Sequence, residues 1–96
     1  MSVLTCIAKI QAKAGAEEQV KQALSKLLEP TRQEEGCLNY DLHVDNEDPT
    51  IFMFHENWQS EAMLDQHLES KHIKECFELI GGLLASVEIN RLSKIG

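Results

Sequence analysis

The chain of 96 residues carries 16 acidic and 9 basic side chains, a net charge of −7 at neutral pH, and 43% of its residues are hydrophobic. This length fits one small domain spanning residues 1–96, and the hydrophobic content is typical of a globular fold and not of a disordered chain. A surface of this charge repels phosphate backbones and anionic lipid headgroups, so nucleic acid and membrane partners are disfavoured. No apolar run approaches the roughly 20 residues that span a bilayer.

The cysteines and the N-terminal residues indicate a cytoplasmic protein. Cys6, Cys37 and Cys76 are odd in number and lack a Cys-x-x-Cys spacing, which predicts free, buried thiols in a reducing compartment. The first ten residues, MSVLTCIAKI, have no basic region or cleavage site of the kind found in signal peptides.

The N-terminal third of the chain predicts a strand followed by a helix. Val3 to Gln11 is rich in β-branched and apolar residues and predicts the first strand. After Gly15, two glutamates occupy the first turn of a helix, where the helix dipole favours them. Pro30 should kink or interrupt this helix, and Gly36 is a candidate C-terminal cap. The helix presents one apolar stripe: Val20, Ala23, Leu24, Leu27 and Leu28.

Two alternating segments predict a β-hairpin. Residues 37–45 and 50–58 each alternate between two faces, and the four residues between them have turn chemistry. One face of the first strand carries Leu38, Tyr40, Leu42 and Val44, with Asn39, Asp41 and His43 on the other. One face of the second strand carries Phe52, Phe54, Glu56 and Trp58, with Ile51, Met53, His55 and Asn57 on the other.

The C-terminal part predicts two helices and a last strand. Ser60 can cap a helix in which His67 shares an apolar stripe with Leu64 and Leu68. The following helix ends near Gly81 and is followed by a strand over residues 86–92. The order β-α-β-β-α-(α)-β predicts an α+β, ferredoxin-like split βαβ fold, an antiparallel sheet with helices on one face. The later helix buries Ile73, Cys76, Phe77 and Ile80.

The opposite face of this sheet also carries apolar residues. Val3, Ile7, Ile51 and Met53 alternate with the residues that face the helices. An exposed apolar face requires a cover, and the simplest cover is a second copy of the chain. A homodimer is therefore expected.

The spacing of the histidines does not indicate a metal site. His67 and His72 are five positions apart, which places them on different faces of one continuous helix, and no Cys/His ligand motif is present. Whether His43 and His55 share a sheet face depends on the hairpin register. No nucleotide-binding loop or nucleophile motif occurs, so any chemistry is expected to proceed without a bound cofactor.

General acid–base chemistry is the remaining hypothesis. On an apolar helix face, His67 would be partly desolvated and therefore neutral, as a base must be near neutral pH. Tyr40 and Trp58 offer flat surfaces for an aromatic substrate, and Glu56 or Asn57 could orient a hydroxyl group. The alternative is that His67 is a hydrogen-bonded core residue and Trp58 part of the core.

Three segments together resemble the antibiotic biosynthesis monooxygenase (ABM) domain. They are Glu35-Gly36-Cys37-Leu38-x-Tyr40-Asp41-Leu42, Phe52-x-Phe54-x-Glu56-x-Trp58 and His67-Leu68-x-x-x-His72. The resemblance covers nearly the whole chain and is greatest to small stand-alone bacterial members, the YgiN-like quinol monooxygenases. It implies a dimeric α+β barrel in which two sheets pack together.

The resemblance also implies an activity: oxygenation of a quinol or other phenolic aromatic by O2 without flavin, haem or metal. A base removes the phenolic proton and the electron-rich anion itself reduces O2. His67 and Glu56 are the expected catalytic residues, and His72 matches a second recurrent histidine of the family. The expected substrate contacts are Tyr40, His43, Asn57, Trp58, His72 and Phe77.

Related activities remain alternatives. Haem-degrading relatives carry an asparagine, a tryptophan and a histidine at three positions of their site. The corresponding positions of this chain hold Ala8, His67 and Phe77, so haem degradation is disfavoured. Autoinducer-processing relatives share the histidine and the glutamate, which leaves open an isomerase-like proton transfer on a small signalling metabolite. A dimer that binds a small aromatic without catalysis is the third possibility.

Overall fold

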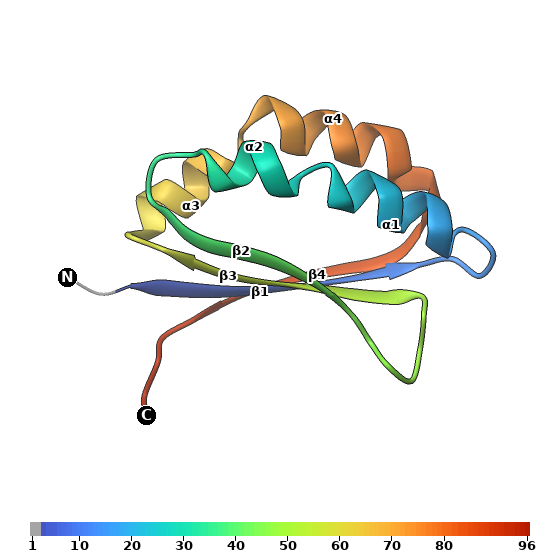
Figure 1. The fold of residues 1–96 in the computed structure, drawn as a ribbon, viewed down its shortest axis with the longest axis horizontal. Coiled ribbons are helices and arrows are strands. Elements are labelled where there is room, and N and C mark those ends of the chain that lie inside the picture. Colours follow the sequence, from blue (N-terminus) through green and yellow to red (C-terminus); the bar gives the residue numbers. More distant parts are fainter. Residues whose placement is uncertain (1–2) are drawn as a thin grey trace.

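The computed structural model describes residues 3–96 and confirms the α+β, ferredoxin-like fold. Four antiparallel strands form one sheet in the order β2-β3-β1-β4, and all the helices lie on one face of it (Figure 1). The elements are β1 (Leu4–Ala12), α1 (Glu17–Ser25), α2 (Leu28–Arg32), β2 (Cys37–Val44), β3 (Ile51–Trp58), α3 (Glu61–Leu68), α4 (Lys71–Ile80), the short 3-10 helix η1 (Gly81–Leu83) and β4 (Leu84–Leu92).

The predicted helix around Pro30 is two helices. α1 ends at Ser25, before the proline, and Pro30 lies at the third position of α2. A proline is tolerated in the first turn of a helix because the N–H it lacks has no partner there. Within residues 3–96, no helix is long and apolar enough to cross a membrane.

The hairpin register confirms the predicted alternation except at one residue. Tyr40 pairs with Glu56 and Val44 with Phe52, so these side chains share the face covered by the helices. Between Cys37 and Asn39 the register shifts, and Leu38 is 50% exposed. A bulge inserts one unpaired residue and interrupts the alternation. The expectation that Leu38 faces the core with Tyr40 is therefore wrong.

The core lies between the sheet and the helices, and the other sheet face, here called the outer face, is uncovered in the single chain (Figure 1). On the outer face Ile7 and Met53 are partly exposed, and they lie among polar neighbours such as Lys9 and Glu88. The outer face thus carries both apolar and polar side chains, as the predicted alternation requires. The largest fully buried side chains belong to Trp58, Tyr40, Phe52, Phe54, Ile10 and Leu24.

Gly36 fixes the loop that enters β2, and its replacement tests this contact. Its φ is +87°, and a Cβ added there would lie 2.5 Å from Cγ of Met63. Gly15 has a similar φ of +89°, but nothing lies within 4 Å of its added Cβ. Because Gly15→Ala carries the backbone strain without the clash, it is the matched control.

We expect Gly36→Ala to lower the free energy of unfolding by about 1–2 kcal/mol more than Gly15→Ala does, since Met63 must move. Urea denaturation of both variants measures this difference. Equal losses in the two variants would mean that Met63 adjusts without cost.

Candidate active site

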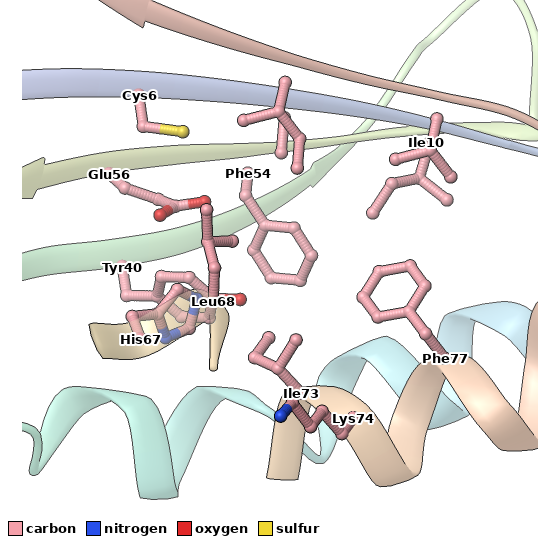
Figure 2. Close-up of a pocket in the computed structure, with 13 residues that line it drawn as sticks. Cys6, Ile10, Tyr40, Phe54, Glu56, His67, Leu68, Ile73, Lys74 and Phe77 are labelled. Carbon is pink, nitrogen blue, oxygen red and sulfur yellow. The ribbon is translucent and has the colours of Figure 1, made fainter. Parts of the chain in front are cut away.

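A cavity of about 390 Å³ lies between the sheet and helices α3 and α4. Figure 2 shows Cys6 and Glu56 reaching it from the strands and His67 and Phe77 from the helices. Its wall at β4 is formed by Val87 and Ile89, which are nearly half exposed, so the cavity opens at that edge. The lining is mostly apolar: Cys6, Ala8, Ile10, Tyr40, Phe54, Glu56, His67, Leu68, Ile73, Lys74, Phe77, Val87 and Ile89.

His67 is buried against aromatic rings at one end of this cavity. Its residue is 1% exposed, and its ring lies 4.8 Å from the Trp58 ring and 5.3 Å from the Tyr40 ring, centroid to centroid. Burial lowers the pKa of His67, against the opposing effect of the Glu34 carboxylate. The imidazole is therefore neutral near pH 7 and able to accept a proton.

Glu34, which the sequence patterns did not single out, holds His67 in place. Nδ1 of His67 lies 2.8 Å from Oε2 of Glu34. Within residues 3–96, the other ring nitrogen, Nε2, has no hydrogen-bond partner, and His67 lines the cavity. Glu34 lies in the loop before β2, 33 positions from His67, so no periodic pattern links the two residues.

Glu56 is the carboxyl group that lines the cavity. It is 3% exposed and accepts a hydrogen bond from the indole N–H of Trp58, 2.9 Å from Nε1 to Oε1. Burial raises the pKa of Glu56 to about 7, although the bond from Trp58 acts in the opposite direction. Near neutral pH, Glu56 is therefore divided between its acid and its carboxylate forms.

The cysteines of the structure are free thiols. Cys6 lies at the cavity, but burial raises its pKa to about 12, so it is a neutral thiol and a poor nucleophile. Cys76 is buried as well, and Cys37 is half-buried.

The structure brings together four of the predicted site residues. Tyr40, Glu56, His67 and Phe77 all line the cavity. Trp58 does not line it. Instead, its fully buried ring lies behind His67 and its N–H bonds Glu56, so it supports the site from the core.

His43 and Asn57 lie on the outer face of the sheet. In the hairpin register His43 pairs with Met53, and Asn57 bonds Asn39 and Thr5 across the strands. The expectation that both residues contact a substrate held by His67 is corrected, because the sheet separates them from the cavity. The sequence predicted that both residues lie on the face opposite Tyr40 and Glu56, but it did not predict which face lines the cavity.

His72 does not line the cavity either, but it meets His67 at Glu34. α3 ends at Leu68 and α4 begins at Lys71, so the two histidines lie on separate helices and not on one continuous helix. Nε2 of His72 lies 2.7 Å from Oε2 of Glu34. The spacing argument against a shared ligand position was therefore wrong, because the facing nitrogens and carboxylate oxygen lie within 4.8 Å of one another.

These distances fit hydrogen bonds better than metal ligation. Ligand atoms around a tetrahedral zinc ion, each about 2.0–2.1 Å from the metal, lie about 3.3 Å apart. Both imidazole nitrogens are closer than that to the same oxygen of Glu34, at the usual N–H···O distance. The arrangement is that of a neutral imidazole at an apolar cavity, oriented by a carboxylate, with a second proton carrier nearby.

Comparison with known proteins places the chain in a family. The model of the antibiotic biosynthesis monooxygenase family matches residues 3–79, and the chain belongs to this family. It is 29% identical over 100 residues to the Escherichia coli K12 protein named "Probable quinol monooxygenase YgiN", covering 94% of this chain and 96% of that protein. It is 30% identical to the uncharacterized protein sll1783 of Synechocystis, covering 90% of this chain but only 58% of that protein.

Solved structures agree with the fold. The crystal structure of PA3566 from Pseudomonas aeruginosa has a TM-score of 0.94 and 35% sequence identity, and the match covers 100% of this chain and 97% of that one. The resemblance to the ABM domain is thus confirmed. The family and the Escherichia coli relative both carry the name monooxygenase.

Proposed function

We propose that this protein is a cofactor-independent monooxygenase that oxidises a quinol or polyphenolic aromatic with O2, with His67 as the base. The observation that supports it most is the neutral His67 ring, bonded to Glu34 through Nδ1 and placed at an apolar cavity. Family membership supports the reaction class.

Proton removal starts the reaction. Nε2 of His67 takes the phenolic proton of the bound substrate, and the resulting aryloxide is a much stronger reductant than the phenol. It transfers one electron to O2, and the two radicals combine at a ring carbon to give a peroxide. The apolar lining excludes water that would otherwise compete for the proton and solvate the anion.

The products balance without an external reductant. A hydroquinone and O2 give a hydroxyquinone and water: one oxygen atom bonds to the ring carbon, which loses its hydrogen as a proton, and the other leaves as water. The substrate supplies all four electrons that reduce O2. Cleavage of the O–O bond requires a proton for the departing oxygen. Glu56 is placed to donate it, since at a pKa of about 7 part of its population is protonated at neutral pH.

The cavity favours a small, flat substrate. Its volume of about 390 Å³ is near the lower end of the range for ligand pockets, about 300–1,000 Å³. Tyr40 stacks on Phe54 at 4.6 Å to form one aromatic wall, and Phe77 contributes to the other side. We therefore propose an aromatic of one or two fused rings.

Oxygen uptake tests the proposal. The purified protein is mixed in an oxygen electrode with a panel of benzene- and naphthalene-based hydroquinones, each corrected for its spontaneous oxidation. Uptake above the spontaneous rate, with one water formed per O2 consumed and no hydrogen peroxide, supports a monooxygenase. Uptake no faster than the spontaneous rate across the whole panel contradicts it.

A proton-transfer enzyme is the second candidate, because a neutral histidine and a glutamate of raised pKa in one cavity are also what an isomerase requires. Turnover of a small ketone that proceeds without O2 and is lost in His67→Gln would favour it. Ligand-dependent thermal stabilisation with no product from any substrate would instead favour a non-catalytic binding protein.

We also propose a homodimer in which a second copy covers the outer face. Ile7 and Met53 lie there partly exposed, and Leu92 is 42% exposed. We expect sedimentation velocity to give a dimer at micromolar concentration. Met53→Glu should shift it toward the monomer, because removing the added carboxylate from water costs more than its pairing with Lys9 on the neighbouring strand returns. The control is Glu78→Gln on α4, on the helical side. A monomer in the unmodified protein contradicts this proposal.

A further inference from the structure

Glu34, His67 and His72 come from three different elements and meet at a single oxygen atom. Glu34 lies in the loop between α2 and β2, His67 near the end of α3 and His72 in the first turn of α4. Oε2 of Glu34 is 2.8 Å from Nδ1 of His67 and 2.7 Å from Nε2 of His72. No other carboxylate is bonded to either ring among residues 3–96.

A carboxylate oxygen offers only lone pairs, so each of these contacts requires an N–H on the imidazole. His67 therefore carries its proton on Nδ1, which leaves a lone pair on Nε2, the nitrogen without a partner. The contact with Glu34 alone accounts for the proton on Nδ1 of His67. The same rule gives His72 a proton on Nε2.

We infer that Glu34 is a positioning residue that selects the Nδ1–H tautomer of His67, and that His72 holds Glu34 in the required orientation. This inference rests on the proposed role of His67 as the base. A reversed tautomer would present an N–H to the substrate hydroxyl and could not accept its proton.

The burial of the three side chains agrees with these roles, since exposure increases from His67 to Glu34 to His72. The side chain of His67 is 2% exposed, that of Glu34 18% and that of His72 26%. His72 reaches Glu34 from a second, smaller hollow of about 210 Å³ between α1 and α4, and its Nε2 also lies 3.4 Å from the Ser70 hydroxyl. The carboxylate is thus fixed from the side away from the cavity.

Long-range 1H–15N NMR of the 15N-labelled protein without substrate tests the tautomer directly. We expect His67 to show a protonated Nδ1 and an unprotonated Nε2 at pH 7.5. In Glu34→Ala the population should shift toward Nε2–H, whereas Glu35→Ala should leave it unchanged. Glu35 is the matched control because it is the neighbouring residue with the same charge, and it is exposed.

Activity gives the second readout. We expect Glu34→Ala to lower kcat by at least about tenfold with little change in KM, and His72→Ala to lower it less.

An Nε2–H tautomer in the unmodified protein overturns the inference, as does a bound metal ion at one per chain whose removal changes the NMR signals of both rings. If the tautomer is the expected one but the protein has no oxygenase activity, the proposed function is refuted and the role of Glu34 in selecting the tautomer is not. If Glu34→Ala fails to fold, the spectrum of the unmodified protein still decides.

Discussion

Replacing His67 with glutamine is expected to lower kcat for hydroquinone oxidation by about 10²–10⁴-fold, the usual contribution of a general base. Glutamine is similar in size to histidine and can still bond Glu34 through its amide N–H, but it cannot accept a proton. KM should change little, because the walls formed by Tyr40 and Phe77 remain. Steady-state oxygen uptake measures both constants.

His43→Gln is the matched control for this experiment. His43 lies on the outer face, and the sheet separates it from the cavity, so the same substitution there should leave kcat unchanged. Circular dichroism and thermal unfolding show whether His67→Gln remains folded. A folded variant with the full rate would remove His67 from the mechanism.

Glu56→Gln is expected to make the protein less sensitive to alkaline pH. The pKa of Glu56 is raised from 4.5 to about 7 in the folded state, so folding favours its protonated form. A raised pKa contributes stability that is fully present below about pH 4.5, declines as the pH rises and is lost above about pH 7. At about 1.36 kcal/mol per pH unit, the whole difference is roughly 3 kcal/mol.

Urea denaturation of both proteins between pH 4 and pH 8 checks this expectation. The free energy of unfolding of the unmodified protein should fall relative to that of Glu56→Gln over this range, because glutamine does not titrate and its carbonyl can still accept the Trp58 N–H. The decline should lie between pH 4.5 and 7. Parallel curves would show that Glu56 titrates as it does in the unfolded chain.

The fold was largely predictable because it depends on periodicity, which is local. The alternation of residues 50–58 and the apolar spacing around Leu64 both identified the correct buried faces. The exceptions have local causes as well. Leu38 lies at a bulge, and the break before Pro30 lies where α1 ends at Ser25.

The site was less predictable because it depends on contacts between distant elements. Sequence spacing identified His67 and Glu56 but treated His67 and His72 as parts of one helix. Glu34 gives no periodic signal, because the position of a loop residue depends on the helix and strand that the loop connects, here α2 and β2. Asn57 shows the remaining limit: alternation separates two sheet faces without indicating which one lines the cavity.

The joint between α3 and α4 is only two residues long, Glu69 and Ser70. With so short a joint, the position of His72 relative to His67 depends on the path of these two residues, because α4 begins directly after them. An inserted residue would have to bulge out of this joint, or else move the His72 ring from Glu34 and the buried side chains of α4 from the core. Chain length at this one corner is consequently under a geometric constraint that the surface loops elsewhere, such as the turn at residues 45–50, do not share.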